Sequence, residues 1–96
     1  MKYKIFISQP MNNKSNRDIE LERKELVKEL KKQGFEVLDT ILDLGKNATS
    51  LHYLAKSIEI MAEADIVLFM QGWENARGCI IEHEVALKYG KYVKEL

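Results

Sequence analysis

A glutamate in an apolar setting is the residue of this sequence best suited to chemistry. The run Gly72–Glu82 follows the apolar segment 66–70 and leads into a stretch with helical periodicity. At about 100° per residue, Glu82 falls inside an apolar stripe made by Ile81, Val85, Ala86 and Tyr89. A carboxylate directed into a packed face, at the mouth of an expected ligand cleft, is a candidate catalytic group.

Two loops are expected to form that cleft. A glycine-bounded turn between a strand and a helix is a common ligand site, because the helix start offers unpaired N–H groups. The run 72–78 is such a turn, and the run 8–13 (Ser-Gln-Pro-Met-Asn-Asn) follows the first expected strand. Together they offer hydroxyl, amide, backbone N–H and guanidinium groups, which suit phosphate or sugar.

Each of these residues also has a plainer interpretation. Glu82 also fits a role accepting hydrogen bonds from its own helix start or pairing with Arg77. Arg77 is either an anion ligand or a solvated surface charge. Trp73 either stacks on a base or anchors its loop against the core. Cys79 is a nucleophile only if the helix start lowers its pKa, and a small packing residue is the favoured interpretation.

The hydrophobic periodicity predicts alternating strands and helices. Strands are expected at 3–8, 35–38, 65–70 and from 92, and helices at 15–33, from 49 or 50, and at 78–89. Right-handed crossovers then give a small doubly wound parallel α/β sheet of the flavodoxin/Rossmann-like type, with order 2-1-3-4 and helices on both faces. Residues 1–96 are expected to form a single domain.

The composition excludes several classes of function. The 96 residues carry 15 basic and 15 acidic side chains, so no charge footprint for nucleic acid or membrane is expected. The single cysteine fits a reducing cytoplasm, and no signal peptide or membrane-spanning run is apparent. His52 and His83 stand apart and lack cysteine partners, so no metal site is expected. His52 is interpreted as a surface residue, and His83 as either solvated or at an interface.

Five segments together resemble the nucleoside 2-deoxyribosyltransferase superfamily. They are the runs 7–11 (Ile-Ser-Gln-Pro-Met), 53–57 (Tyr-Leu-Ala-Lys-Ser), 64–67 (Ala-Asp-Ile-Val), 72–79 and 82–86. The resemblance covers essentially the whole chain and is most specific between Gly72 and Ala86. It is nearest to a short bacterial and phage branch of unknown function, related to the 2'-deoxynucleoside 5'-phosphate N-hydrolases.

The resemblance implies an enzyme that cleaves the bond between a base and a deoxyribose. Gly78 and Glu82 match the relatives' G-x-x-x-E context, so Glu82 is implied to be the nucleophile that forms a glycosyl ester. The substrate is a nucleoside or nucleotide, and no metal or organic cofactor is implied. The expected substrate-binding residues are Ser8, Gln9, Pro10, Met11, Ser57, Gly72, Trp73, Glu74, Arg77, Gly78 and Cys79.

Two positions depart from the relatives' pattern. Ser57 stands where many relatives carry an aspartate, and a serine carries no charge near neutral pH. Phe6 lacks the hydroxyl that relatives place near the end of the first strand. A non-catalytic module that binds or senses a nucleotide in the same cleft is therefore the alternative function.

An association of copies is also expected. Ile80 and Leu87 are spaced i and i+7 on the last expected helix, on the side opposite its packed stripe. An exposed apolar pair on a helix that flanks the site suggests a partner surface, and the characterised relatives are homo-oligomers. We therefore expect a homodimer or a higher homo-oligomer.

Overall fold

The computed structural model describes residues 2–39 and 43–96. Its elements are β1 (Lys4–Ser8), α1 (Asn16–Lys32), β2 (Glu36–Val37), α2 (Ser50–Met61), β3 (Ile66–Phe69), a short 3₁₀ helix η1 (Trp73–Asn75), α3 (Arg77–Lys88) and β4 (Tyr92–Glu95). The alternation of strands and helices predicted from the sequence is confirmed. The 3₁₀ turn before α3 was not predicted, β2 is shorter than expected, and β4 begins at Tyr92 as expected.

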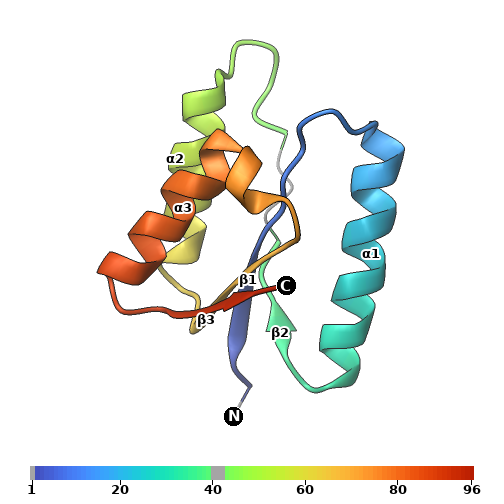
Figure 1. Ribbon diagram of the computed structural model, residues 1–96, viewed down its shortest axis with the longest axis vertical. Helices are drawn as coiled ribbons and strands as arrows, with labels where there is room; N and C mark the ends of the chain where they lie inside the picture. The colour runs from blue at the N-terminus through green and yellow to red at the C-terminus, as the bar shows by residue number, and fades with distance from the viewer. Residues whose placement is uncertain (1, 40–42) are drawn as a thin grey trace.

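The four strands form one parallel sheet in the order β2-β1-β3-β4. Figure 1 shows α1 on one face of this sheet and α2 with α3 on the other. The fold class and the strand order predicted from the sequence are therefore confirmed. Ser8, at the end of β1, pairs in register with Phe69 at the end of β3, so the loops that follow these two strands begin side by side.

Two apolar clusters fill the spaces on either side of the sheet. One joins β1 and β3 to α2 and α3, through Phe6, Val67, Phe69, Met61 and Ala86. The other joins the same strands to α1, through Ile5, Ile7, Leu68 and Leu30. Because β1 and β3 carry apolar side chains on both faces, they read as nearly continuous hydrophobic runs, which is typical of a parallel sheet covered on both sides.

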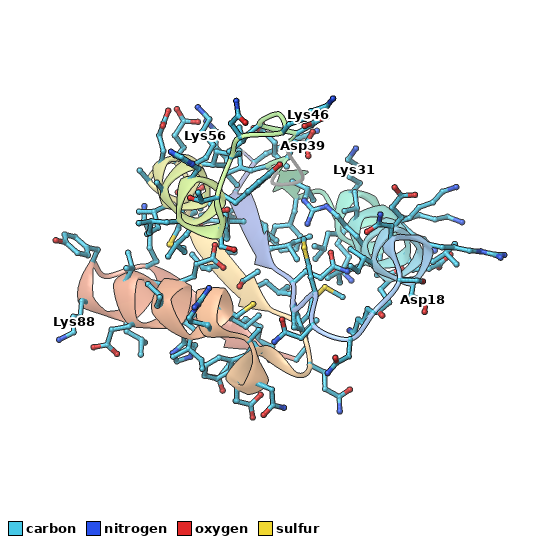
Figure 2. The ribbon with its side chains drawn as sticks, turned by 90° about the horizontal axis from the view of Figure 1, so that it is seen from above. Asp18, Lys31, Asp39, Lys46, Lys56 and Lys88 are labelled. Atoms are coloured by element: carbon cyan, nitrogen blue, oxygen red, sulfur yellow. The ribbon has the colours of Figure 1, made fainter. Side chains whose placement is uncertain are left out.

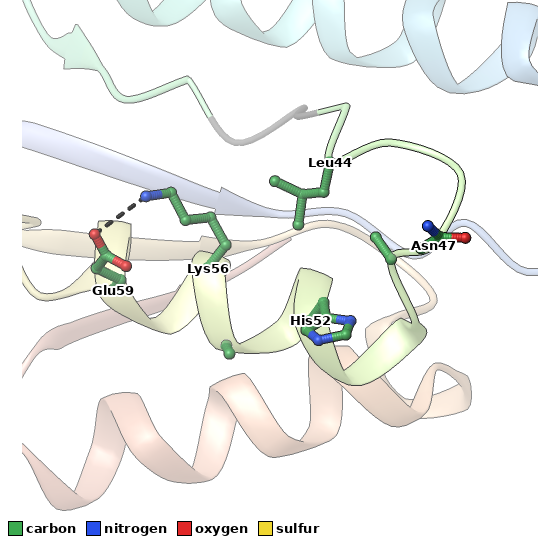
Figure 3. Close-up of a pocket in the computed structure, with 7 residues that line it drawn as sticks. Leu44, Asn47, His52, Lys56 and Glu59 are labelled. Carbon is green, nitrogen blue, oxygen red and sulfur yellow. Dashed lines mark hydrogen bonds and ion pairs between the residues drawn. The ribbon is translucent and has the colours of Figure 1, made fainter.

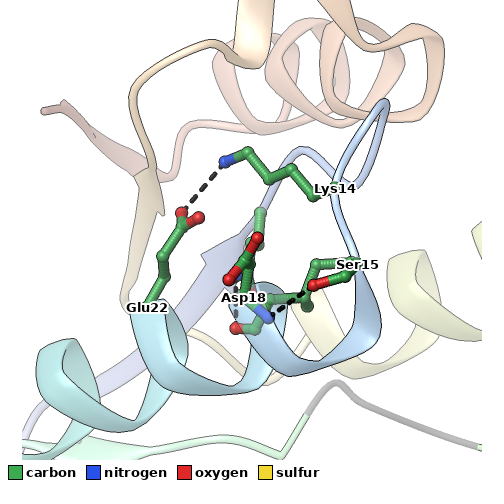
Figure 4. A network of polar contacts seen from close by, with 6 residues as sticks. Lys14, Ser15, Asp18 and Glu22 are labelled. Carbon is green, nitrogen blue, oxygen red and sulfur yellow. Dashed lines mark hydrogen bonds and ion pairs between the residues drawn. The ribbon is translucent and has the colours of Figure 1, made fainter.

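The helix ends follow local capping rules. Ser15 caps α1, as expected, by accepting a hydrogen bond from the Asp18 amide at 3.1 Å, and Lys14 forms an ion pair with Glu22 at 2.9 Å (Figure 4). Gly34 follows the end of α1 with a φ of 95°, a conformation that favours glycine. Thr49 begins α2 in a capping box with His52, so His52 has a local structural role on an exposed face.

The apolar faces of α2 and α3 are only partly covered. On α2 only Met61 is buried and Leu51 is 71% exposed. On α3 the buried residues are Cys79, Glu82 and Ala86, whereas Tyr89, which was expected in the packed stripe, is 80% exposed. The helix is rotated so that the small side chains of Cys79 and Ala86 are buried, together with Glu82. Charged side chains such as Lys31, Lys56 and Lys88 project outward around the molecule (Figure 2).

In the described part of the chain, no helix is both long and apolar enough to cross a membrane.

Candidate functional site

A cavity of about 450 Å³ lies where the loops after β1 and β3 meet the starts of α2 and α3. Figure 1 shows these segments gathered at one end of the molecule, beyond the carboxyl ends of the strands. This is the edge at which open α/β sheets bind ligands. The cavity is lined by Gln9, Met11, Asn12, Ser50, Tyr53, Leu54, Ser57, Ala76, Arg77, Gly78, Cys79 and Glu82.

Glu82 is held in this cavity by a residue 74 positions earlier in the chain. The Ser8 hydroxyl donates a hydrogen bond of 2.7 Å to Glu82 Oε1. Ser8 is 2% exposed and Glu82 is 7% exposed, so the pair lies at the base of the cavity. Glu82 Oε2 has no hydrogen-bond partner among the described residues. One oxygen is thus oriented by the protein, and the other is left for a ligand.

The protein environment stabilises the protonated form of Glu82 relative to a carboxyl group exposed to water. Burial raises the pKa of Glu82 from its usual 4.5 to about 7, and the hydrogen bond from Ser8 acts in the opposite direction. No ion pair links Glu82 to Arg77 or to any other described residue. Glu82 is the sixth residue of α3, so it lies beyond the unpaired N–H groups of the first turn. The two plainer interpretations of Glu82 from the sequence are therefore wrong.

Cys79 lies three residues before Glu82 on α3, and the residue is 5% exposed. Burial raises the pKa of the Cys79 thiol, the Glu82 charge raises it further, and the neighbouring Ser8 hydroxyl lowers it. The thiol therefore stays protonated near neutral pH and is a poor nucleophile. The structure supports the packing interpretation of Cys79.

Gln9 lines the cavity and holds a buried hydrogen-bond acceptor that has no partner among the described residues. Its amide nitrogen Nε2 donates to the Ile19 carbonyl at 2.8 Å, which fixes the orientation of the amide. Its oxygen Oε1 is buried and has no partner among the described groups. A buried acceptor without a partner destabilises a protein by about 1–3 kcal/mol.

The start of α3 is suited to bind an anion. The N-cap residue Ala76 offers no side-chain hydrogen bond, and the first turn carries no acidic residue. The first N–H groups of a helix have no partners within the helix. Arg77 is exposed, lines the cavity and makes no ion pair with a described residue. Guanidinium and backbone N–H groups together are good partners for a phosphate.

One face of α2 forms the wall opposite these groups, and the sequence analysis identified only part of it. Ser50, Tyr53 and Leu54 join the expected Ser57 at positions i, i+3, i+4 and i+7. Helical spacing from Ser57 was the signal that could have found them. Asn12 and Ala76 belong to the two loops that were expected to form the cleft, and both line it. The Asn12 amide donates to the Asn75 carbonyl at 2.9 Å and so links the two loops.

Five residues expected to bind substrate do not line the cavity, and one of them, Ser8, contacts the lining residue Glu82 instead. Gly72 adopts a φ of 94°, and a side chain there would contact the Pro10 ring at 3.6 Å. Both residues therefore shape the loops. Glu74 is exposed in η1. Trp73 packs against the apolar cluster on the α2 and α3 side of the sheet, so the structure supports its role as a loop anchor.

The side chain of His83 is only 15% exposed, so the expectation that it is solvated is wrong. Its ring stacks on Trp73 with centroids 4.0 Å apart and planes at 9°, and it meets Phe69 edge-on at 4.8 Å. Its Nε2 lies 2.6 Å from Glu95 Oε2 on β4. Through His83, the part of α3 that carries Glu82 thus packs against η1, β3 and β4.

A second hollow of about 480 Å³ lies on another side of α2, and Figure 3 shows its lining. Its one carboxylate, Glu59, pairs with Lys56 at 3.1 Å, and its histidine, His52, serves the capping box. The hollow therefore offers no free reactive group, and the cavity around Glu82 is the better candidate site. Nowhere in residues 2–39 and 43–96 do three His, Cys, Asp or Glu side chains gather as metal ligands would.

The chain matches a known protein family over nearly its whole length. A family model described as "Domain of unknown function (DUF4406)" matches residues 3–95. Curated proteins give no match.

We expect Glu82→Gln to stabilise the protein more at high pH than at low pH. The folded pKa of about 7 exceeds the unfolded value of 4.5, so wild-type stability falls as the pH rises between these values and is level above them. The amide variant lacks this loss. Its advantage in free energy of unfolding should grow by about 3 kcal/mol between pH 4.5 and pH 8, as measured by urea denaturation.

The matched control for this experiment is Glu84→Gln. Glu84 lies two residues further along α3, is exposed and pairs only with Lys88 at 3.2 Å, so its variant should show a constant difference from wild type. If the free energies of unfolding of Glu82→Gln and wild type changed in parallel with pH, the pKa of Glu82 would not be raised by folding.

We expect Ser8→Ala to raise the pKa of Glu82 above about 7, because the Ser8 hydroxyl stabilises the ionised carboxylate. The side-chain carboxyl carbon of Glu82, followed by NMR across a pH titration, reports this value directly. Ser57→Ala removes another cavity hydroxyl that does not contact the carboxylate, and should leave the pKa unchanged. An unchanged or lower pKa in Ser8→Ala would contradict the hydrogen-bond assignment.

Proposed function

We propose that this chain, which belongs to the DUF4406 family, is a nucleoside or nucleotide N-glycosidase or deoxyribosyltransferase that uses Glu82 as its nucleophile. The observation that carries the proposal is the oriented carboxylate. Glu82 lies at the base of a ligand-sized cavity, with Oε1 bound by Ser8 at 2.7 Å and Oε2 without a partner in the described structure. Its resemblance to the nucleoside 2-deoxyribosyltransferase superfamily is part of the same proposal.

The proposed reaction has two displacements at one carbon. The ionised Glu82 attacks C1' of the deoxyribose, a C–O bond forms, and the base leaves with the electron pair of the C–N bond. Water or a second base then attacks C1' and releases Glu82 from the glycosyl ester. Two inversions at C1' give overall retention, as in retaining glycosidases.

The rest of the cavity has groups that match such a substrate. Its volume of about 450 Å³ falls in the range of small-molecule sites. Arg77 and the open start of α3 suit a 5'-phosphate. The serine and tyrosine hydroxyls of α2 suit sugar hydroxyls or the edge of a base.

A non-catalytic nucleotide-binding module is the second candidate, and one observation favours it. Glycosidases usually use two carboxylates, whereas Glu82 is the only carboxylate among the described residues that line the cavity. Ser57 lines it without a charge. A module of this kind would bind deoxynucleotides and raise the melting temperature without releasing free base.

A cytoplasmic location belongs to the same proposal. The one cysteine is unpaired and buried, which fits a reducing compartment.

We expect wild type to release free base from at least one 2'-deoxynucleoside or 2'-deoxynucleoside 5'-monophosphate, and Glu82→Gln to lose this activity by on the order of 10³-fold or more. The amide keeps the size of the carboxylate but cannot form the ester. Chromatography of each reaction measures the free base, and an added second base distinguishes transfer from hydrolysis. Melting curves check that the variant is folded. Activity of the variant near that of wild type would overturn the role of Glu82.

The pH dependence gives a second readout of the same role. A nucleophile must be ionised, so kcat/KM should rise with pH and level off above the Glu82 pKa of about 7. A rate that falls through the same range would show that Glu82 acts as an acid.

We also propose that copies of this chain associate at least as a homodimer through α3, α2 or both. Ile80 and Leu87 are 46% and 54% exposed on α3, and Leu51 of α2 is 71% exposed. The exposed apolar side chains of α3, or those of α2, offer a surface that a second copy can cover, and a two-fold axis is the commonest arrangement.

We expect wild type to have the mass of a dimer or larger assembly in light scattering at micromolar concentration, and Leu87→Glu to shift it toward the monomer. A charge at the contact must be desolvated on association. Leu21→Glu is the matched control, because Leu21 is 51% exposed on α1, across the sheet. A monomeric wild type, or a Leu87→Glu variant that assembles unchanged, would contradict this interface.

A further inference from the structure

The cavity holds a nucleophile but no obvious acid. Glu82 is the only carboxylate among the described lining residues. A base that leaves C1' carries away the electron pair of the broken bond, so it needs a proton or a strong hydrogen bond as it departs. Another lining group must supply this proton if the proposed reaction runs at a useful rate.

The groups near Glu82 are poorly suited to the task. Ser8 already donates its hydroxyl hydrogen to Glu82 Oε1. Burial and the Glu82 charge both raise the pKa of the Cys79 thiol, which disfavours loss of its proton. Arg77 stays protonated in proteins and is not a proton donor.

The α2 wall offers three hydroxyl groups, on Ser50, Tyr53 and Ser57. A phenol, with a usual pKa of about 10, is much more acidic than a serine hydroxyl. Tyr53 is therefore the strongest neutral acid on this wall. It comes from a different helix than the nucleophile, which suits a reaction in which the leaving group departs on the side away from Glu82.

The hydrogen bonding of Tyr53 leaves its proton available. The Leu44 amide donates to the Tyr53 hydroxyl oxygen at 3.2 Å. No described group accepts the Tyr53 hydroxyl hydrogen, and the residue is 37% exposed. The oxygen is thus held by the backbone while its hydrogen is free for a ligand. The same amide would hydrogen-bond the phenolate after the proton had left.

We propose that Tyr53 is a second catalytic residue, which protonates the departing base from the α2 wall of the cavity. This rests on the proposed function. In the first step Glu82 bonds to C1', the C1'–N bond breaks, and the Tyr53 proton moves to the base nitrogen. In the second step water attacks C1', the ester bond to Glu82 breaks, and the proton lost by the water returns to the Tyr53 phenolate. The sum is hydrolysis, with both residues restored.

A substrate that needs no proton isolates this role. The base of N7-methyl-2'-deoxyguanosine is cationic and leaves as a neutral molecule, whereas the base of 2'-deoxyguanosine needs a proton. We expect Tyr53→Phe to lower kcat/KM for 2'-deoxyguanosine by about 100-fold or more, and to change the value for the methylated substrate by less than about 3-fold. Rates are corrected for spontaneous base loss.

The matched variant is Ser57→Ala, which removes another hydroxyl one turn further along the same face of α2. It should change the two substrates by the same factor. Melting curves establish that each variant is folded, and an effect of the lost Leu44 contact alone would also act equally on both substrates.

The outcomes separate the two proposals. An equal loss on both substrates, or no loss on either, in Tyr53→Phe overturns the acid role of Tyr53 while leaving Glu82 as the nucleophile. A wild type that releases base from neither substrate overturns the proposed function for purine deoxynucleosides, and the role of Tyr53 with it.

Discussion

The hydrogen bond between Ser8 and Glu82 is the contact on which the candidate site depends. It joins the end of the first strand to the last helix across 74 positions of sequence and spans 2.7 Å. A buried ionised carboxylate with one neutral partner is energetically unfavourable, and the raised pKa of Glu82 reflects this cost. An unfavourable arrangement of this kind persists only where the surrounding structure imposes it. The fold must therefore bring these two residues together and keep them there.

The sheet and the aromatic stack do this in different ways. Because β1 and β3 are adjacent and parallel, Ser8 lies level with Phe69, and the chain after Phe69 turns through η1 directly into α3. His83 then fixes the rotation of α3, since its ring is held by Trp73 and by Glu95 of β4. With residue 83 held on that side, Glu82 faces the end of β1. Trp73 thus contributes to the site without touching the cavity.

The sequence was informative wherever local rules decide the structure. Apolar periodicity predicted the alternation of strands and helices, and the right-handed crossover rule then gave the strand order. Capping chemistry identified Ser15, and Thr49 was one of two candidates for the second helix. Glu82 was identified because a charge within an apolar stripe violates the helical pattern. The exposure of Tyr89, the stacking of His83 on Trp73 and the hydroxyl groups of α2 that line the cavity were not foreseen. All three depend on how a helix is rotated about its own axis against its neighbours. Hydrophobic periodicity fixes this rotation only to within the angular width of the apolar stripe.

The stability cost of Glu82 bears on the choice between the two functions. A passive binder of nucleotides gains nothing from a buried carboxylate, because its negative charge repels phosphate and its desolvation weakens the fold. The cavity already holds neutral hydrogen-bonding groups and the cation of Arg77, which would serve binding without it. A nucleophile, in contrast, needs a carboxylate that is poorly solvated and has one oxygen free. The retention of Glu82 beside Ser8 therefore favours catalysis over binding alone, even though no second carboxylate lines the described cavity.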